Sequence, residues 1–261
     1  MTATVSDGVP TSAANRTPIA VRIDHVSKRY PTGVLALDDI DLTVAKGEFV
    51  CLVGASGCGK STLLNLIAGL DHPTSGEVSV PGGRTTLLFQ EAALLPWQTA
   101  AGNVELALRL RGVGKAERRA RAQELLELVH LGGMGERRPH ELSGGMRQRV
   151  ALARALAQEP DVLLMDEPFG ALDAMTRDLL HDELERIWSE SGKTIVFVTH
   201  NVREAARLGD RIVLLTSRPG RVAVAFPVRI DRPRRIESPA VSSLAGDVTA
   251  ALRREVARHG R

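Results

Sequence analysis

Hydrophobic and polar residues follow patterns that switch repeatedly between strand and helix along this chain. Residues 19–26 alternate apolar with polar positions, as expected for a strand with one buried face. Residues 49–53, 162–165 and 194–198 are short uninterrupted apolar runs, which are typical of strands buried on both faces of a parallel sheet. Segments with helical periodicity follow these runs. This order predicts an α/β fold whose central sheet is mixed and largely parallel.

Weaker patterns divide the chain into a leader, a main domain and an extension. Residues 1–18 are rich in Thr, Ser, Ala and Pro and are expected to be disordered, whereas residues 19–232 carry the α/β pattern. Within that domain, residues 92–158 are expected to form an inserted helical subdomain. Residues 233–261 form a basic extension, of which 240–259 have the pattern of an amphipathic helix. Further strands are expected at 34–44, 77–80, 85–89, 211–215 and 222–230, the first of them in an antiparallel N-terminal region.

The most informative stretch is a glycine-rich loop between a strand pattern and a helix pattern. Its spacing is G-x-x-x-x-G-K-[ST], which lets successive backbone N–H groups turn toward an anion, and the following helix adds its positive N-terminal end. Lys60 is expected to reach the outer phosphates of a nucleoside triphosphate, and the Ser61 hydroxyl is expected to bind Mg²⁺. A chance Lys in a structural turn would not explain the strand and helix on either side. The predicted nucleotide-binding residues of the loop are Gly54, Ala55, Ser56, Gly57, Cys58, Gly59, Lys60, Ser61 and Thr62.

Two other apolar runs deliver polar residues at their carboxyl ends. Asp166 and Glu167 follow one run, and His200 follows the other. Because the carboxyl ends of parallel strands share one edge of a sheet, we expect these residues to lie beside the phosphate loop. Asp166 is predicted to hold Mg²⁺, and Glu167 to polarise an attacking water. Alone, the acidic pair would suit an ordinary turn after a core strand equally well.

A second helix start is also prepared for an anion. Ser143 is a natural N-cap, and Gly144 and Gly145 leave the end of the helix uncovered. A single triphosphate does not need both helix starts from the same chain. We therefore expect the second start to complete a nucleotide site on another copy of the chain.

Composition and charge limit the class of protein. The 261 residues are 43% hydrophobic and 25% charged, as in a soluble globular protein, and no apolar run suggests a signal peptide or a membrane span. Cys51 and Cys58 have no metal-ligand spacing and suit a reducing compartment.

The net charge is unevenly placed along the chain. Residues 229–261 hold eight Arg and four acidic residues, which gives this segment a net charge of +4. The whole chain has a net charge of +3, so the remaining residues sum to −1. A near-neutral body argues against a nucleic-acid partner. The extension is expected to be mainly solvated, with contact to a partner or an anionic membrane as the alternative.

Together these motifs resemble the ATP-binding subunit of ABC transporters over about residues 20–230. Residues 54–62 resemble the Walker A loop, 142–146 the signature, 166–167 the Walker B pair and 171–173 the D-loop. Met146 departs from the signature, which usually has Gln at this position, but Ser143, Gly144 and Gly145 are intact. The resemblance implies adenine stacking by Tyr30 (a plain packing role fits the sequence equally), Mg²⁺ sensing by Gln90, nucleotide contact by Asp173, and γ-phosphate contact by His200.

The resemblance also implies partners and a location. ATP and Mg²⁺ would lie at the interface of a head-to-tail homodimer, on the cytoplasmic face of the cell membrane as a peripheral subunit. Two transmembrane permease subunits and a solute-binding protein would complete the transporter. Residues 94–97, 143–149 and 217–221 resemble importers of nitrate, taurine and aliphatic sulfonates, so a small anion is the expected solute. Pro96 and Trp97 suit either permease contact or packing within the helical subdomain.

Two other functions stay open on the sequence. One is an ABC-type ATPase that acts on DNA or ribosomes, and the other is the ATPase subunit of an exporter. The first class should have a long coiled coil, duplicated cassettes or a basic body, and none of these is visible in the sequence.

Overall fold

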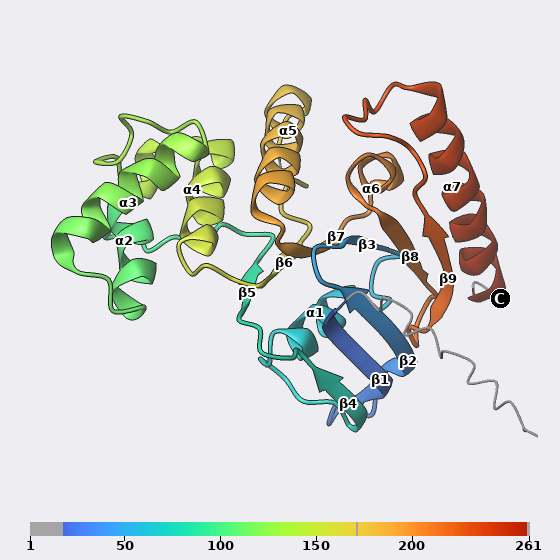
Figure 1. The fold of residues 1–261 in the computed structure, drawn as a ribbon. Helices are drawn as coiled ribbons and strands as arrows, with labels where there is room; N and C mark the ends of the chain where they lie inside the picture. Colours follow the sequence, from blue (N-terminus) through green and yellow to red (C-terminus); the bar gives the residue numbers. More distant parts are fainter. Residues whose placement is uncertain (1–17, 171, 260–261) are drawn as a thin grey trace, which may run out of the picture.

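A computed structural model describes residues 18–170 and 172–259, and it contains two sheets that share a core (Figure 1). The larger sheet has the order β5-β6-β7-β3-β8-β9 and is parallel except for β9, which pairs antiparallel with β8. The smaller sheet is antiparallel, with the order β2-β1-β4. The strands are β1 (Ile19–Arg29), β2 (Leu35–Ala45), β3 (Phe49–Val53), β4 (Ser75–Ser79), β5 (Thr85–Leu88), β6 (Val162–Asp166), β7 (Thr194–Val198), β8 (Arg211–Leu215) and β9 (Val222–Pro227). The helices are α1 (Lys60–Ile67), α2 (Ala100–Leu110), α3 (Lys115–Leu128), α4 (Gly144–Leu156), α5 (Ala174–Ser191), α6 (Val202–Leu208) and α7 (Pro239–His259), with a short 3-10 turn at Pro139–Glu141.

The predicted α/β fold, with its mixed sheet and antiparallel N-terminal region, is confirmed. The expected disorder of the leader concerns residues 1–17, which lie outside the described residues, as does Ala171 in the segment that resembles the D-loop.

The larger sheet is buried on both faces because its central strands are apolar at every position. In β3, Phe49, Cys51 and Val53 belong to the core shared with α4, α5, α6 and α7, whereas Val50 and Leu52 belong to the core shared with α1 and the smaller sheet. This alternation is the two-residue period of a strand between two layers. In Figure 1 the helices α5, α6 and α7 lie on one side of the sheet, with α1 and the smaller sheet on the other.

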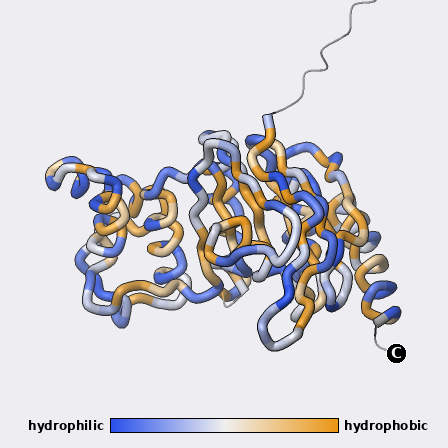
Figure 2. The backbone as a smooth tube through the Cα atoms, turned by 90° about the horizontal axis from the view of Figure 1, so that it is seen from below, coloured by the Kyte–Doolittle hydropathy of each residue, from blue (hydrophilic) through white to orange (hydrophobic). Residues whose placement is uncertain are grey.

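The hydropathy of the backbone follows the same layers. Figure 2 shows hydrophobic strands in the middle of the molecule and hydrophilic residues in many of the surrounding loops. Across the ranges described, no helix has both the length and the apolar character needed to cross a membrane.

The helices α2, α3 and α4 form a group of their own beside the sheet (Figure 1). The chain enters this group after β5 and leaves it before β6. Fully buried Val104, Leu108, Leu126 and Val150 come from the three helices and hold the group together. Gly112, with φ +84°, ends the α2 segment in a left-handed turn that favours glycine. The segment that contains Gln90 runs from β5 to α2 and so joins the sheet to this helical group.

The C-terminal extension, expected to be mainly solvated, is exposed at many positions but also forms the expected amphipathic helix and buries one face of it. Helix α7 packs on α6, and its Val241 and Val248 are fully buried in the larger core. Arg234 is 5% exposed and donates to the carbonyls of Arg207 and Gly209 at 3.1 and 2.6 Å. Arg232 lies over the ring of Trp188, 4.3 Å from its centre, and so covers the core as well. Burial of one helix face and pairing of two arginines therefore make the extension part of the folded domain.

Candidate functional site

The glycine-rich loop leaves β3 and turns directly into α1. Gly59 has φ +97°, and a Cβ there would lie only 2.6 Å from Leu37 Cδ2, so the turn requires glycine. Lys60 is 7% exposed, and its Nζ donates to the carbonyls of Gly54 and Ala55 at 3.0 Å each. The loop therefore fixes its lysine close to the positions where backbone N–H groups would cradle phosphates.

Both cysteines of this region are buried free thiols. Burial raises the pKa of the Cys58 thiol, whose Sγ lies 3.8 Å from the Nζ of Lys60. Burial also raises the pKa of Cys51, on β3, well above its usual value. Cys58 fills space beside the loop, whereas Cys51 packs in the core on the other face of the sheet, next to Gly209.

The loop forms one wall of a pocket of about 640 Å³. Residues 59–62 line it together with Ser56, Gly57, Tyr30, Gln90 and Glu167. The Tyr30 hydroxyl lies 3.1 Å from Thr62 Oγ1, which holds the aromatic ring at the mouth of the pocket. The fold thus brings together predicted residues from four separate segments of the chain.

The end of β6 reaches the loop through Asp166. Burial raises the pKa of the Asp166 carboxyl, a hydrogen bond with Ser61 opposes that rise, and the charge of Glu167 adds to it. The carboxylate, the Ser61 hydroxyl and the Gln90 amide all offer oxygen, the ligand type that Mg²⁺ prefers. These residues fit a magnesium ion, whose charge would favour the ionised form of Asp166.

Glu167 and His200 meet because β6 and β7 are parallel neighbours. The register pairs Asp166 with Val198, so both strands end at the same edge of the sheet, as expected. Glu167 Oε2 lies 2.9 Å from His200 Nδ1. Glu167 has φ +45°, a strained conformation for a residue other than glycine, and its N–H donates to the Val198 carbonyl at 3.0 Å. The strained turn aims the carboxylate toward the pocket.

A buried glutamine of α4, which the sequence did not single out, ties this region together. The Nε2 of Gln148 donates to the carbonyls of Gln90 and Pro168 at 2.8 and 2.7 Å. Gln90 lines the pocket, and Pro168 directly follows Glu167. The helix α4, which Ser143 caps, is therefore bonded to the Gln90 and Pro168 segments of its own chain.

The signature residues themselves lie outside the pocket of the phosphate loop. Ser143 caps α4 by accepting a hydrogen bond from Met146 N at 3.2 Å. Asp173 caps α5 by accepting a hydrogen bond from Thr176 N. Hydrogen bonding with Thr176 lowers the pKa of the Asp173 carboxyl. A Cβ on Gly145 would lie 2.8 Å from Thr176 Cγ2, so the two helix starts are neighbours. Within one chain the structure therefore groups Ser143, Gly145 and Asp173 with one another, away from Lys60.

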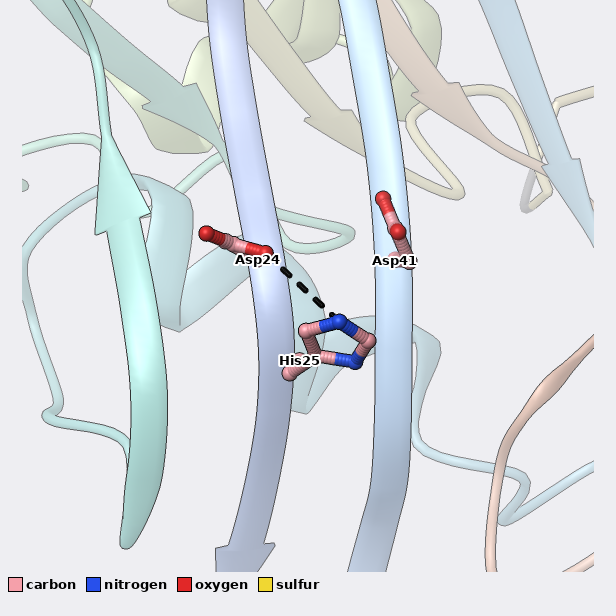
Figure 3. A group of neighbouring side chains, drawn as sticks. All are labelled: Asp24, His25 and Asp41. Atoms are coloured by element: carbon pink, nitrogen blue, oxygen red, sulfur yellow. Dashed lines mark ion pairs between the residues drawn. The ribbon is translucent and has the colours of Figure 1, made fainter.

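A separate acidic group lies on the smaller sheet (Figure 3). Asp24, His25 and Asp41 are exposed on β1 and β2, with ligand atoms close enough to share a cation. The hydrogen bond to Asp39, at 2.8 Å, raises the pKa of His25, and the charges of Asp39 and Asp24 add to it. Protonation of the imidazole therefore competes with metal binding at these three residues. These residues do not line the pocket of the phosphate loop.

Comparison with known proteins decides the family. A sequence profile described as ABC transporter matches residues 37–170. This chain belongs to the ABC transporter family. The cassette is 45% identical to an uncharacterised ABC transporter ATP-binding protein of Methanocaldococcus jannaschii, over 84% of this chain and 86% of that relative.

Three relatives carry names that state a solute. A taurine import ATP-binding protein of Rhizobium johnstonii is 44% identical over 90% of the cassette and 94% of the relative. A nitrate import ATP-binding protein of Synechococcus elongatus is 42% identical over 88% of the cassette and 89% of the relative. A bicarbonate transport ATP-binding protein of Synechococcus elongatus is 44% identical over 92% of the cassette, which spans 41% of that longer protein.

Solved ATP-binding cassettes share the fold. One, a dimer in a post-hydrolysis state bound to ADP and phosphate, superposes with a TM-score of 0.74 and 37% identity, over 81% of this chain and all of that one. Family and fold together make the cassette an ATP-binding ATPase subunit.

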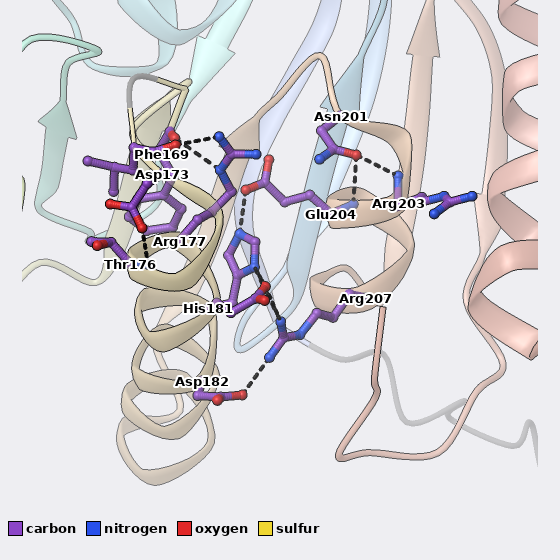
Figure 4. A network of polar contacts seen from close by, with 12 residues as sticks. Phe169, Asp173, Thr176, Arg177, His181, Asp182, Asn201, Arg203, Glu204 and Arg207 are labelled. Carbon is purple, nitrogen blue, oxygen red and sulfur yellow. Dashed lines mark hydrogen bonds and ion pairs between the residues drawn. The ribbon is translucent and has the colours of Figure 1, made fainter. Parts of the chain in front are cut away.

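The cassette also contains a buried polar network between α5 and α6 (Figure 4). His181 is fully buried and bonds through Nε2 to Glu204, whose other oxygen accepts the Thr199 hydroxyl. The His181 ring also packs edge-on against Phe169, with 5.5 Å between ring centres. Phe169 follows Glu167 by two residues, and Thr199 precedes His200. The network therefore links the two segments that carry the Glu167–His200 pair.

Arg207 closes the network on its other side. Its guanidinium lies 3.3 Å from His181 Nδ1 and forms ion pairs with Asp178 and Asp182 of α5. The carbonyl of Arg207 in turn accepts a hydrogen bond from Arg234 of the C-terminal extension. No sequence motif marks these residues, because each is an isolated polar residue in an amphipathic helix.

We expect His181→Leu to lower the free energy of unfolding by about 3 kcal/mol, because it leaves Glu204 buried without its main partner. Urea denaturation would measure the loss. His140→Leu, at an exposed histidine, is the control and should change stability by less than about 0.5 kcal/mol. Equal effects of the two substitutions would contradict a stabilising role for the buried pair.

Proposed function

We propose that this cassette hydrolyses ATP to energise import of a small anion across the cytoplasmic membrane. The observation that carries the proposal is its 44% and 42% identity, over nearly the whole chain, to relatives named for taurine and nitrate import. The solute is a taurine-like or aliphatic sulfonate, a nitrate-like anion, or bicarbonate, after the names of these relatives and the resemblance of residues 94–97 and 217–221.

The phosphate loop would bind the nucleotide. Backbone N–H groups of residues 54–62 would surround the phosphates, Lys60 would contact the outer ones, and Tyr30 would stack on adenine. Mg²⁺ would be held by Ser61, Gln90 and Asp166, where it neutralises phosphate charge. The pocket supports this assignment, because it contains an aromatic ring, a cation and oxygen donors.

Glu167 would act as the general base. Its carboxylate would orient water and accept its proton, while His200 would hold that carboxylate and contact the γ-phosphate. The 2.9 Å contact between the two side chains supports the pairing. Gln90 would couple the nucleotide site to the helical group α2–α4, since Gln148 of α4 donates a hydrogen bond to the Gln90 carbonyl.

A head-to-tail homodimer would complete two such sites. Ser143, Gly144, Gly145 and Asp173 lie away from Lys60 in one chain, so each would serve the nucleotide of a second copy. The start of α4 would offer its N-terminal N–H groups to the γ-phosphate. Closure of the dimer would exclude water and assemble the site, and opening after hydrolysis would reset it.

The partners in the membrane would be two permease subunits, with the cassette as a peripheral subunit on the cytoplasmic face and a solute-binding protein delivering the anion. Phe89, next to Gln90 in the chain, is 46% exposed, and Trp97, in the loop between Gln90 and α2, is 67% exposed. Such exposure does not fit core packing of Trp97, and it supports contact with a permease.

The proposal is tested with the transporter reconstituted in proteoliposomes. We expect ATP hydrolysis to rise several-fold when taurine, an alkanesulfonate, nitrate or bicarbonate is supplied with the solute-binding protein. Lys60→Ala should remove both basal and stimulated hydrolysis. Stimulation by a cation or a neutral solute, with no response to any of these anions, would overturn the choice of solute class while leaving the ATPase intact.

A further inference from the structure

The turn between β8 and β9 is fixed against the phosphate loop by its backbone. Gly220 donates to the Ala36 carbonyl, and Asp38 donates to the Gly220 carbonyl, each at 2.9 Å. A Cβ on Gly220 would lie 2.1 Å from the carbonyl oxygen of Cys58, so no other residue fits there. The position of this turn over the loop is therefore set by main-chain contacts and by a required glycine.

Bonds within the turn hold its shape. The Thr216 hydroxyl donates to the Pro219 carbonyl and accepts from Arg221 N, each at 2.9 Å. Arg221 also forms an ion pair with Asp38 on β2. One of the two arginines of the turn is thus neutralised by a partner on the smaller sheet.

The other arginine, Arg218, projects over the pocket of the phosphate loop. It lines that pocket with Tyr30, Lys60 and Glu167, and one guanidinium nitrogen lies 3.3 Å from the point that a Cβ on Gly57 would occupy. Among residues 18–170 and 172–259, Arg218 makes no hydrogen bond or ion pair that would satisfy its charge. Lys60, the other cation of the pocket, is already bonded to two loop carbonyls.

We propose that Arg218 is a second cationic contact for the phosphates of the nucleotide bound in the same chain. A guanidinium presents paired N–H donors that match phosphate oxygens, and it stays charged at all working pH values. The rigid turn holds the side chain beside Gly57, at the side of the loop whose N–H groups would face the phosphates. Arg218 then adds positive charge to a site in which the negative charges of Glu167 and Asp166 would repel a triphosphate.

Calorimetric titration of the Arg218→Ala cassette with MgATP tests this assignment. We expect Kd to rise on the order of ten-fold, as for loss of one hydrogen-bonded charge. Displacement of a fluorescent ATP analogue should show a similar loss for inorganic tripolyphosphate and none for adenosine. Arg218→Lys should fall between Arg218→Ala and the unchanged protein, because it keeps the charge without the paired donors.

Arg229→Ala is the matched control, because it removes an exposed arginine that does not line the pocket. This variant should bind MgATP within about two-fold of the unchanged protein, and thermal denaturation should show that all variants are folded. Arg218→Ala binding within two-fold of the unchanged protein would overturn the proposal. An equal loss for adenosine and tripolyphosphate would also overturn it, since that outcome indicates a displaced turn or a contact with the nucleoside.

Discussion

Glu167→Gln should reduce steady-state ATP hydrolysis by at least about 10²-fold and leave ATP binding nearly unchanged, because general-base assistance contributes about 10²–10⁴-fold. The substitution keeps the size of the side chain and a hydrogen-bonding oxygen near His200, but it removes the group that accepts the proton of water. Phosphate release under single-turnover and steady-state conditions measures the loss, and calorimetry with MgATP measures binding.

The same variant should accumulate as a dimer with ATP. If the signature residues of one copy complete the site of another, a cassette that binds ATP without hydrolysing it stays closed, and size-exclusion chromatography should detect the dimer. Glu136→Gln, at an exposed glutamate, is the control and should hydrolyse ATP normally and not accumulate as a dimer. A monomeric Glu167→Gln protein at saturating ATP would contradict the head-to-tail arrangement.

The sequence alone predicted the site residues that lie directly at the end of a predicted strand or in the phosphate loop. The uninterrupted apolar runs marked β3, β6 and β7, and parallel pairing then required Asp166 and His200 to reach one edge of the sheet. Phosphate-loop spacing fixed the position of Lys60 at the start of α1. In each case the residues that define the element also position the functional group, so no long-range information was needed.

Contacts between distant segments could not be predicted in this way. His181 and Glu204 are 23 positions apart and meet only because α5 and α6 pack on the same face of the sheet. Gln148 is a polar residue in an amphipathic helix, and only the fold shows that it faces the Gln90 and Pro168 carbonyls. Arg218 gains its significance from a turn that is bonded to β2, some 180 positions earlier.

The C-terminal extension shows how a charge count can mislead. Eight arginines suggested a solvated segment, but Arg234 is buried with three carbonyl partners, Ile230, Arg207 and Gly209. Arg232 is paired with Glu185 and Asp210. Net charge records how many charges a segment carries and says nothing about the acceptors that the rest of the fold supplies.

Val248→Asp should destabilise the cassette by about 4 kcal/mol or more, because it places an unpaired charge in the core between α7 and α6. Val248 is fully buried, whereas Val256, on the same helix, is 47% exposed. Val256→Asp is therefore a matched control that adds the same charge to the same element, and it should change stability by less than about 1 kcal/mol.

Thermal and urea denaturation of both variants would measure the difference. For a chain of this size, a loss of 4 kcal/mol corresponds to a Tm lowered by about 10 °C. An extension that only rests on the surface would give equal, small shifts for the two variants. A large shift for Val248→Asp alone means that the buried face of α7 stabilises the domain, where α7 packs on α6, the helix that carries Glu204 and Arg207.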